Sequence, residues 1–311
     1  MARYILINSA RGLLTILLVS VIVFFLARLT GDPMDVLAPV DMSFEDKEAL
    51  RQQWGLDKPL PEQYAIFIAN AVRGDFGPSF LYRGETAGDV ILERLPASLK
   101  LGIVATILTI VIGVPLGILS AVKRGTILDA IVRGFALFGQ SVPEFWLGIV
   151  LIWVVAVQIG FVPTSGMGSW QSYILPSIVI SIFGIAALLR LFRSAMLETL
   201  GSEYIKLARL KGLSELRVVG KHALKPATIA LLTFFGQLAV RMLTGATVVE
   251  IVFSWPGVGL LAYDAANARD FPIVQALALF GAAAIVVMNL FVDIAYAFID
   301  PRVRLGKKAA A

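Results

Sequence analysis

The sequence contains no cysteine among its 311 residues. This absence excludes a disulfide framework, a thiolate metal site and a cysteine nucleophile. The chain has one histidine, His222, which excludes a metal site built from several histidines. Nowhere does a glycine-rich turn lead into Gly-Lys-Ser or Gly-Lys-Thr, so the phosphate-binding loop of P-loop nucleotidases is also absent from the sequence.

Charge is scarce as well. Only 16% of the residues are charged and 58% belong to the apolar set, whereas a soluble domain is about 25% charged. This composition indicates an integral membrane protein surrounded by membrane lipid. The net charge of +5 is explained by basic residues on cytoplasmic loops, which we favour over binding of nucleic acid.

Six apolar segments are long enough to cross a bilayer, which takes roughly 20 helical residues. They are residues 12–27, 101–122, 135–160, 174–189, 226–249 and 271–292. The sequence therefore predicts an all-α polytopic membrane protein with six transmembrane helices. The basic N-terminus also fits a signal peptide, but no small-x-small cleavage site follows it, and an uncleaved first span is the better interpretation.

Basic residues predict the orientation of the chain. Residues 190–225 hold eight Lys or Arg against three Glu, whereas residues 31–97 hold six against twelve Asp or Glu. The short turn 123–133 and the C-terminal tail are also basic. Because cytoplasmic loops are enriched in Lys and Arg, we expect both termini and the 195–225 loop on the cytoplasmic side.

The chain divides into a first span (1–30), an outer loop (31–97) and a core (98–311). Capping residues predict three helices in the outer loop, so that it forms a helical extracytoplasmic cap. The first begins after Ser43 and ends before Gly55, the second runs from Pro61 to Gly74, and the third runs from Thr86 to Pro96.

The segment EYIKLARLKGLSELRVVGKHALKPA (203–227) is a basic loop between apolar segments. Ser202 and Ser214 are placed as N-caps, and Gly212 as a left-handed stop between them, which predicts a helix–glycine–helix element. A loop held by lipid headgroups and a DNA-binding helix-turn-helix are two interpretations. A docking element for a cytoplasmic partner is the third.

An apolar face favours docking. Tyr204, Leu207, Ala208 and Lys211 recur at spacings of three and four, which places them on one face of the first helix. A loop that only contacts headgroups has no need of such a face.

The same loop resembles the EAA loop of ABC importer permeases. The resemblance rests on these residues: Glu203, Tyr204, Ala208, Arg209, Lys211, Gly212 and the later His222. It implies that the first six residues belong to a coupling helix that sits in a cleft of the ATPase subunit. The fold it implies is that of a type I ABC importer permease.

Further stretches resemble the dipeptide and oligopeptide subfamily, in the subunit with the long first outer loop. They include RGDFGPS (73–79), ERLPASLKL (93–101), SVPEFWLG (141–148), VVEIVFSWPGVG (248–259) and RDFP (269–272), together with LTGDP (29–33), LRQQWGLDKPLPEQY (50–64) and DPR (300–302). Thr30 departs from the proline that is common in this subfamily.

This resemblance implies a location and partners. The chain is expected in the bacterial inner membrane as a transport subunit and not an enzyme, with no cofactor of its own. A second homologous permease, two ATP-binding subunits or domains that bind ATP and Mg, and an extracytoplasmic substrate-binding protein are the implied partners. Peptides are the implied cargo; relatives carry glutathione, nickel chelates and opine-type solutes.

Polar residues at membrane depth are candidates for the translocation pathway, because burying them in lipid is costly. They are Gln140, Ser141, Glu144, Gln237, Arg241 and Asn289. A structural pairing, such as Arg241 with a carboxylate, is the alternative to a pathway role.

A second set marks a candidate outer gate within a re-entrant segment (251–271). Its members are Glu250, Trp255, Pro256, Gly257 and Gly259. The prolines and glycines predict a break in the fifth span and a short helix near 258–268; an ordinary structured loop is the alternative.

Two other function classes fit less well. An intramembrane enzyme needs paired catalytic groups within the membrane, and the only histidine lies in the cytoplasmic loop. An ion-coupled carrier or a channel needs no ATPase, which leaves the 203–227 loop without a purpose.

Overall fold

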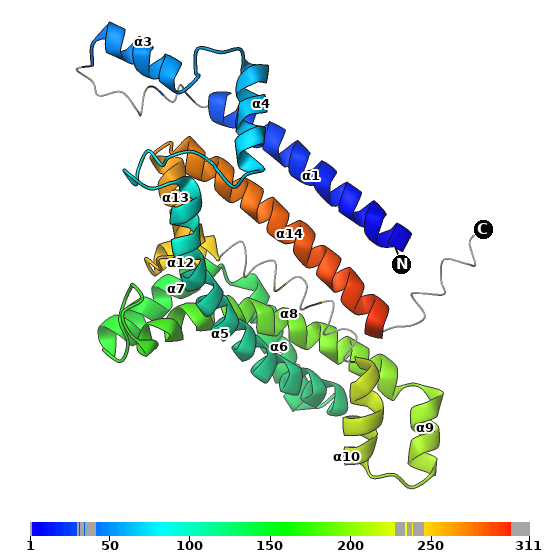
Figure 1. The fold of residues 1–311 in the computed structure, drawn as a ribbon. Helices are drawn as coiled ribbons and strands as arrows, with labels where there is room; N and C mark the ends of the chain where they lie inside the picture. Colours follow the sequence, from blue (N-terminus) through cyan, green and yellow to red (C-terminus); the bar gives the residue numbers. More distant parts are fainter. Residues whose placement is uncertain are drawn as a thin grey trace. The chain divides into compact units, whose positions relative to one another are not determined.

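The computed structural model describes residues 2–29, 31, 34, 42–227, 234, 238 and 246–299, with the side chains of 2–5, 53 and 292–299 left aside. The chain forms two compact units (Figure 1). The first comprises residues 1–98 and 256–290, and the second comprises residues 99–255 and 291–311. The described residues are mostly helical, with one isolated bridge between Pro78 and Thr86.

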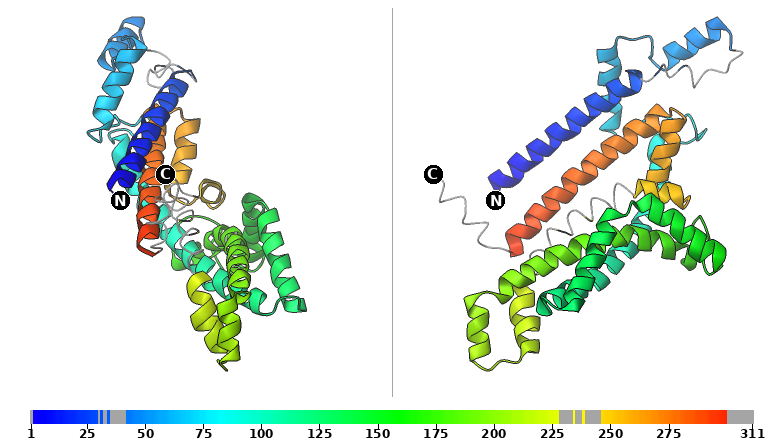
Figure 2. Two further views of the ribbon diagram at one scale, coloured as in Figure 1. Left: turned by 90° about the vertical axis from the view of Figure 1, so that its right-hand side faces the viewer. Right: turned by 180° about the vertical axis from the view of Figure 1, so that it is seen from behind.

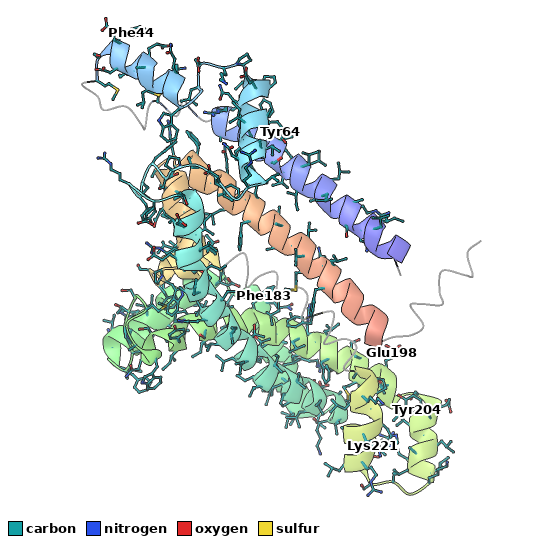
Figure 3. The ribbon with its side chains drawn as sticks, viewed as in Figure 1. Phe44, Tyr64, Phe183, Glu198, Tyr204 and Lys221 are labelled. Atoms are coloured by element: carbon teal, nitrogen blue, oxygen red, sulfur yellow. The ribbon has the colours of Figure 1, made fainter. Side chains whose placement is uncertain are left out.

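In the first unit, the N-terminal helix α1 (Ala2–Leu29) is crossed near its end by α4 (Leu60–Ala71), as Figures 1 and 3 show. The Ser20 hydroxyl lies 2.8 Å from the Tyr64 hydroxyl, and the Phe24 ring packs edgewise on Tyr64. Helix α3 (Phe44–Gln53) begins as predicted, because the Ser43 hydroxyl accepts a hydrogen bond from the Asp46 amide.

The same unit contains α13 (Val258–Asn267), the first part of α14 (Phe271–Ile299) and the start of α5 (Ala87–Val122). The predicted short helix near 258–268 is therefore present. Asp270, which is fully buried, links the loop at residues 79–81 to the start of α14. Its Oδ2 accepts hydrogen bonds from the Ser79 hydroxyl at 2.6 Å, the Phe80 amide at 2.8 Å and the Leu81 amide at 2.9 Å.

Helix α5 corrects one prediction. The third outer-loop helix begins after Thr86 as expected, but it does not stop at Pro96 and continues to Val122. Proline removes one backbone donor, and the carbonyl it leaves without a helical partner belongs to Leu92, an exposed residue. Membrane helices tolerate such a proline where other groups satisfy the freed backbone.

In the second unit, α5 packs closely against α8 (Ile174–Leu200). A Cβ added to Gly117 would lie 3.2 Å from the Leu189 carbonyl oxygen, and one added to Gly184 would lie 2.8 Å from the Thr109 hydroxyl. Small residues at such contacts let membrane helices approach each other. The pair forms the core of this unit together with α6 (Ile127–Ser141).

The predicted third span (135–160) is not a single straight helix. Helix α6 ends at Ser141, and α7 (Glu144–Leu151) with the π-helical η1 (Ile152–Gln158) follows after a bend of 101°. The cause is Pro143, which disfavours a helical conformation at Val142, and Val142 is extended with φ −85° and ψ 125°. Glu144 thus lies in the first turn of α7, where a helix N-terminus favours a carboxylate.

Four described helices are long and apolar enough to span a membrane: Leu6–Leu29, Ala87–Val122, Trp170–Leu200 and Phe271–Phe291. The bent pair formed by α6 and α7–η1 would make a fifth. The first, second, fourth and sixth predicted segments therefore match helices of sufficient length. Most of the fifth predicted segment, 226–249, lies outside the described residues.

Candidate functional site: the 203–227 hairpin and the polar residues

Residues 203–227 form a helical hairpin at the end of α8 (Figures 1 and 2). Helix α9 (Glu203–Leu210) is followed by a turn at Gly212, then by α10 (Glu215–Arg217) and the π-helical η3 (Val218–Ala223). Gly212 has φ +77°, as expected for a left-handed stop. The predicted helix–glycine–helix element is thus present.

Ser202 and Ser214 occupy the predicted N-cap positions, but the side-chain bonds of a cap do not form. Ser202 and Ser214 have the extended backbone of N-caps, but neither side chain accepts a hydrogen bond from its helix. The Ser202 hydroxyl instead donates to the Thr199 carbonyl at 2.6 Å, at the end of α8. This bond joins the start of α9 to the last turn of the preceding helix.

An apolar cluster fixes the hairpin to α8. Ile205 and Val218 are fully buried and pack with Phe192 and Met196 of α8. Ala121 at the end of α5 belongs to the same cluster. The hairpin is therefore part of the folded core of its unit and is not a detached loop.

The predicted common face of the first helix is divided. Ala208 points into the apolar cluster, next to Ile205, which the spacing argument missed. Tyr204 and Leu207 remain about half exposed, at 48% and 51%, and Leu210 is 84% exposed. Figure 3 shows Tyr204 on α9 and Lys221 on the neighbouring η3. Tyr204, Leu207 and Leu210 therefore form an exposed apolar surface on α9, and Leu216 of α10 is exposed as well.

Two of the predicted coupling residues form ion pairs within the hairpin. Arg209 donates two hydrogen bonds to Glu215, at 2.6 Å to Oε1 and 3.2 Å to Oε2. These bonds raise the pKa of Arg209 and lower the pKa of Glu215. Glu203 pairs with Lys206 at 2.7 Å. The Arg209–Glu215 pair therefore joins the two helices that flank the turn at Gly212. Lys211 lies exposed in that turn.

A buried carboxylate ties α5, α6 and α8 together in the same unit. Asp129 accepts hydrogen bonds from the Ser120 hydroxyl at 2.5 Å and from Arg193 Nε at 3.0 Å and Nη2 at 3.1 Å. The Gly125 amide also donates to it at 3.1 Å. Sequence reading missed this network, although Thr126 followed by Asp129 is a helix-start pattern at the beginning of α6.

The candidate pathway residues fall into three groups. Gln140, Ser141 and Glu144 lie together around the bend between α6 and α7, and the Ser141 hydroxyl donates to the Leu137 carbonyl at 2.8 Å. Asn289 is exposed on α14, in the first unit. Gln237 and Arg241 lie outside the described residues.

In the candidate gate, helix α12 (Thr247–Val252) contains Glu250, which is buried. The chain then turns at Ser254, whose φ is +47°, and the Trp255 amide donates to the Glu250 carbonyl at 2.8 Å. Trp255 is fully buried, with its ring edgewise on Tyr173 at 4.6 Å.

The other gate candidates lie in the first unit. Pro256 is half-buried, and Gly257 and Gly259 are buried at the start of α13. The Val258 amide donates to the Ser98 hydroxyl at 2.9 Å. The proline and glycines therefore mark a helix break, as predicted.

Nothing in the described residues gathers three His, Asp or Glu side chains as a metal site would.

Two family models match the chain. Residues 113–305 match the binding-protein-dependent transport system inner membrane component. Residues 1–102 match the N-terminal part of the membrane component of the same systems.

Similar proteins cover nearly the whole chain. The oligopeptide transport system permease protein AppB of Bacillus subtilis is 36% identical over 97% of this chain and 99% of its own length. The dipeptide transport system permease protein DppB of Lactococcus lactis is 38% identical over 98% of this chain and 100% of its own. The glutathione transport system permease protein GsiC of Escherichia coli K12 is 40% identical over 98% and 99%.

Among solved structures, an inward-facing form of the MetNI methionine ABC transporter is similar to this chain. The likeness has a TM-score of 0.54 and 18% identity, and covers 68% of this chain and 96% of the transporter chain. At this identity the likeness concerns the fold alone. The family models and the relatives show that the chain belongs to the inner-membrane components of binding-protein-dependent transport systems, as a multi-pass permease subunit of an ABC importer that works with ATPase subunits.

Proposed function

We propose that this chain forms half of a translocation pathway for small peptides, glutathione among them. Support for the cargo comes from relatives named for oligopeptide, dipeptide and glutathione transport. The other half of the pathway is a second, homologous permease. Two ATP-binding subunits or domains bind ATP and Mg, and an extracytoplasmic binding protein delivers the peptide.

The 203–227 hairpin is the element on which an ATPase subunit docks. The observation that carries this assignment is its division into a buried face, fixed to α8 through Ile205, and an exposed apolar face at Tyr204, Leu207 and Leu210. An exposed apolar patch rimmed by charged groups is typical of a protein interface. The assignment places the hairpin and both termini in the cytoplasm, which agrees with the basic residues of this segment.

Movement then follows from how the hairpin is attached. When the ATPase subunits close around ATP, the docked hairpin is displaced, and α8 moves with it because their side chains share one buried cluster. A change in tilt of such helices switches access to the pathway between the two sides of the membrane. The chain itself binds the ATPase subunits and passes their movement to α8, and the energy comes from ATP hydrolysis in those subunits.

The test is ATP hydrolysis by the complete complex in nanodiscs, with and without its binding protein. We expect a di- or tripeptide mixture with binding protein to raise hydrolysis, and we would compare it with reduced glutathione at equal concentration. Stimulation by glutathione alone would restrict the cargo to that tripeptide. Hydrolysis that responds to neither would refute the peptide assignment and leave the permease family intact.

The docking assignment has its own test. Leu207→Asp adds a charge to the exposed face of α9 without touching the buried cluster. We expect ATPase subunits to be lost from the purified complex, whereas Leu92→Asp, at an exposed position outside the hairpin, retains them. Retention of the ATPase subunits by Leu207→Asp would place the interface elsewhere.

A further inference from the structure

The turn of α8 that holds the coupling hairpin also holds α6. Phe192 and Met196 belong to the apolar cluster that fixes the hairpin, and Arg193 lies between them in the sequence of the same turn. Arg193 Nε donates to Oδ1 of Asp129 at 3.0 Å, and its Nη2 donates to Oδ2 at 3.1 Å. Asp129 lies in the first turn of α6. One turn of α8 is therefore attached both to the hairpin and to the start of α6.

The geometry of this ion pair is fixed. Two parallel hydrogen bonds between a guanidinium and a carboxylate set both the distance and the orientation of the two groups. Only 2% of the Asp129 side chain and 21% of the Arg193 side chain are exposed, so the pair is weakly screened by salt. The Ser120 hydroxyl and the Gly125 amide donate to the same carboxylate. These bonds hold the Asp129 side chain in place, so the start of α6 follows Arg193.

The rest of the contact between α6 and α8 is apolar. Val132 and Ala136 of α6 pack in one buried cluster with Ala186 and Leu189 of α8, and a Cβ added to Gly139 would lie 3.1 Å from the Ala186 Cβ. The hydrophobic effect is non-directional, and packed helices can slide along such surfaces in shear motions. The ion pair supplies the directional contact that resists sliding of α6 along α8.

Helix α6 leads from Asp129 to candidate pathway residues. Ser141, its last residue, lies about 18 Å further along the helix axis. Gln140, Ser141 and Glu144 lie around the bend that follows. Coupling between distant sites is carried by ion pairs and by rigid secondary elements. A displacement of the start of α6 is therefore passed to this bend.

We propose that Asp129 and Arg193 are positioning residues for transport, which pass a displacement of the coupling hairpin from α8 to α6 and so to the bend at Ser141 and Glu144. This inference rests on the proposed docking of ATPase subunits on the hairpin, and it names the route by which their movement reaches the pathway candidates. A purely structural pair is the alternative. Such a pair would keep the unit folded and would have the same effect with and without ATP.

Arg193→Met removes the link between α6 and α8 and leaves the carboxylate with other partners. Asp129 keeps the Ser120 and Gly125 donors, and Arg133 Nε lies 3.5 Å from its Oδ1. Methionine retains an unbranched apolar side chain that adapts to the space. Arg133→Met is the matched control, because it takes the other cation from the same carboxylate. Arg133 belongs to α6 itself, so its loss leaves the link to α8 in place.

Spin labels report whether α6 follows the hairpin. Because the sequence contains no cysteine, cysteines that replace Leu137 of α6, which is 62% exposed, and Lys221 of η3, also exposed, take one label each. A second pair joins Lys221 to Leu13 of α1, which is 67% exposed, and reports movement of the hairpin itself. Double electron–electron resonance measures both distances in the complete transporter in nanodiscs, without nucleotide and after trapping with ATP, Mg and vanadate.

The inference predicts which distances change on trapping. We expect the distance between Lys221 and Leu13 to change in every variant, because the hairpin moves. The distance between Lys221 and Leu137 should stay constant in the wild type and in Arg133→Met, because the two labels move together. In Arg193→Met it should shift on trapping by about 2 Å, as in helix shifts at interfaces. Arg193→Lys should lie between these results, because an ammonium keeps the charge and loses the paired geometry.

ATP hydrolysis gives a second readout. In the same nanodiscs, we expect Arg193→Met to lose about fivefold of the stimulation by binding protein with a di- or tripeptide mixture, the lower end of coupling between linked sites. Arg133→Met should retain the stimulation. Equal stimulation of the two variants would contradict the proposed route.

The distances separate this inference from the docking assignment. If Lys221 moves relative to Leu13 while its distance to Leu137 stays constant in Arg193→Met, the ion pair does not carry the movement, and the docking assignment stands. A distance in Arg193→Met that differs from the wild type equally with and without ATP would identify a purely structural pair. If Lys221 does not move relative to Leu13 in the wild type, the docking assignment is refuted, and this inference with it.

Discussion

Replacing Asp270 with alanine should release the outer loop around residues 79–82 from the start of α14. The Asp270 side chain accepts from the Ser79 hydroxyl and from the Phe80 and Leu81 amides through Oδ2, and from the Ile273 amide at 3.2 Å through Oδ1. The variant leaves all four donors without this acceptor. A buried donor without a partner costs about 1–3 kcal/mol.

Not every donor is affected to the same degree. Phe80 and Leu81 are only part-buried, so water can reach their amides once the loop loosens. The Ser79 hydroxyl and the Ile273 amide are buried and bear the larger cost. Two such groups give a total of about 3 kcal/mol. That free energy corresponds to an increase of about a hundredfold in the population of the opened loop.

Because the sequence contains no cysteine, opening of the loop can be measured with one engineered thiol. Ala87 is fully buried beneath the loop, and its amide donates to the Gly77 carbonyl at 2.9 Å. In an Ala87→Cys background, the rate of maleimide labelling reports opening of the loop. We expect Asp270→Ala to raise this rate by about a hundredfold and Asp264→Ala, on neighbouring α13, to leave it unchanged.

Asp270→Asn refines the test. The amide oxygen can replace Oδ2 for three donors, but its NH₂ group then faces the Ile273 amide, so we expect a labelling rate between those of the wild type and Asp270→Ala. If the rate for Asp270→Ala equals that of the Asp264→Ala control, the carboxylate does not hold the loop and the reasoning is wrong.

Three further predictions concern the second unit. Gly212→Val should insert normally but lose transport-coupled ATP hydrolysis, because φ +77° strains a β-branched residue, whereas Gly212→Asn should retain it; normal coupling in the valine variant would refute the role of this turn. Arg209→Glu should weaken coupling, and the added change Glu215→Arg should restore it, since the two residues pair with each other; failure of the swap would mean that Arg209 contacts the ATPase directly. Asp129→Ala should lower the free energy of unfolding by about 3–5 kcal/mol, because it leaves Arg193 part-buried without its anion; an unchanged melting temperature in detergent would contradict this.

Much of the secondary structure follows from local rules in the sequence. Ser43 caps α3 through its hydroxyl, and Gly212 ends its helical turn with a positive φ. Both depend on residues that are adjacent in the chain, so a single sequence is sufficient to predict them. The helix break before α13 and the presence of that helix follow in the same way from Pro256 and Gly257.

Tertiary contacts account for what the sequence did not predict. Pro96 is read as a stop by local rules, but α5 continues through it, and the carbonyl that the proline leaves without a helical partner belongs to the exposed residue Leu92. Ser202 is a residue type that favours N-caps and has the backbone of one, yet its hydroxyl donates to the Thr199 carbonyl in the preceding helix. Ile205 is buried because η3 folds back beside α9, and no spacing within α9 reveals that.

Two stretches that resemble the dipeptide and oligopeptide subfamily are RGDFGPS at 73–79 and RDFP at 269–272. The structure gives them a shared physical role, because the Ser79 hydroxyl donates to Asp270 across 191 positions of sequence. Each stretch also has local bonds, because Asp75 accepts from the Gly77 amide and Asp270 from the Ile273 amide. A carboxylate and its donors so far apart become one feature only when the helices between them are placed.

The attachment of the hairpin decides how a force applied to it is transmitted. Pulling α9 away from α8 would expose Ile205 and Val218, which are both fully buried, at a cost of about 1.5–3 kcal/mol for each side chain. It would also break the bond from Ser202 to Thr199. Moving α9 and α8 together exposes neither side chain. A partner that bound Tyr204 and Leu207 and pulled on α9 would therefore displace α8 before it detached the hairpin.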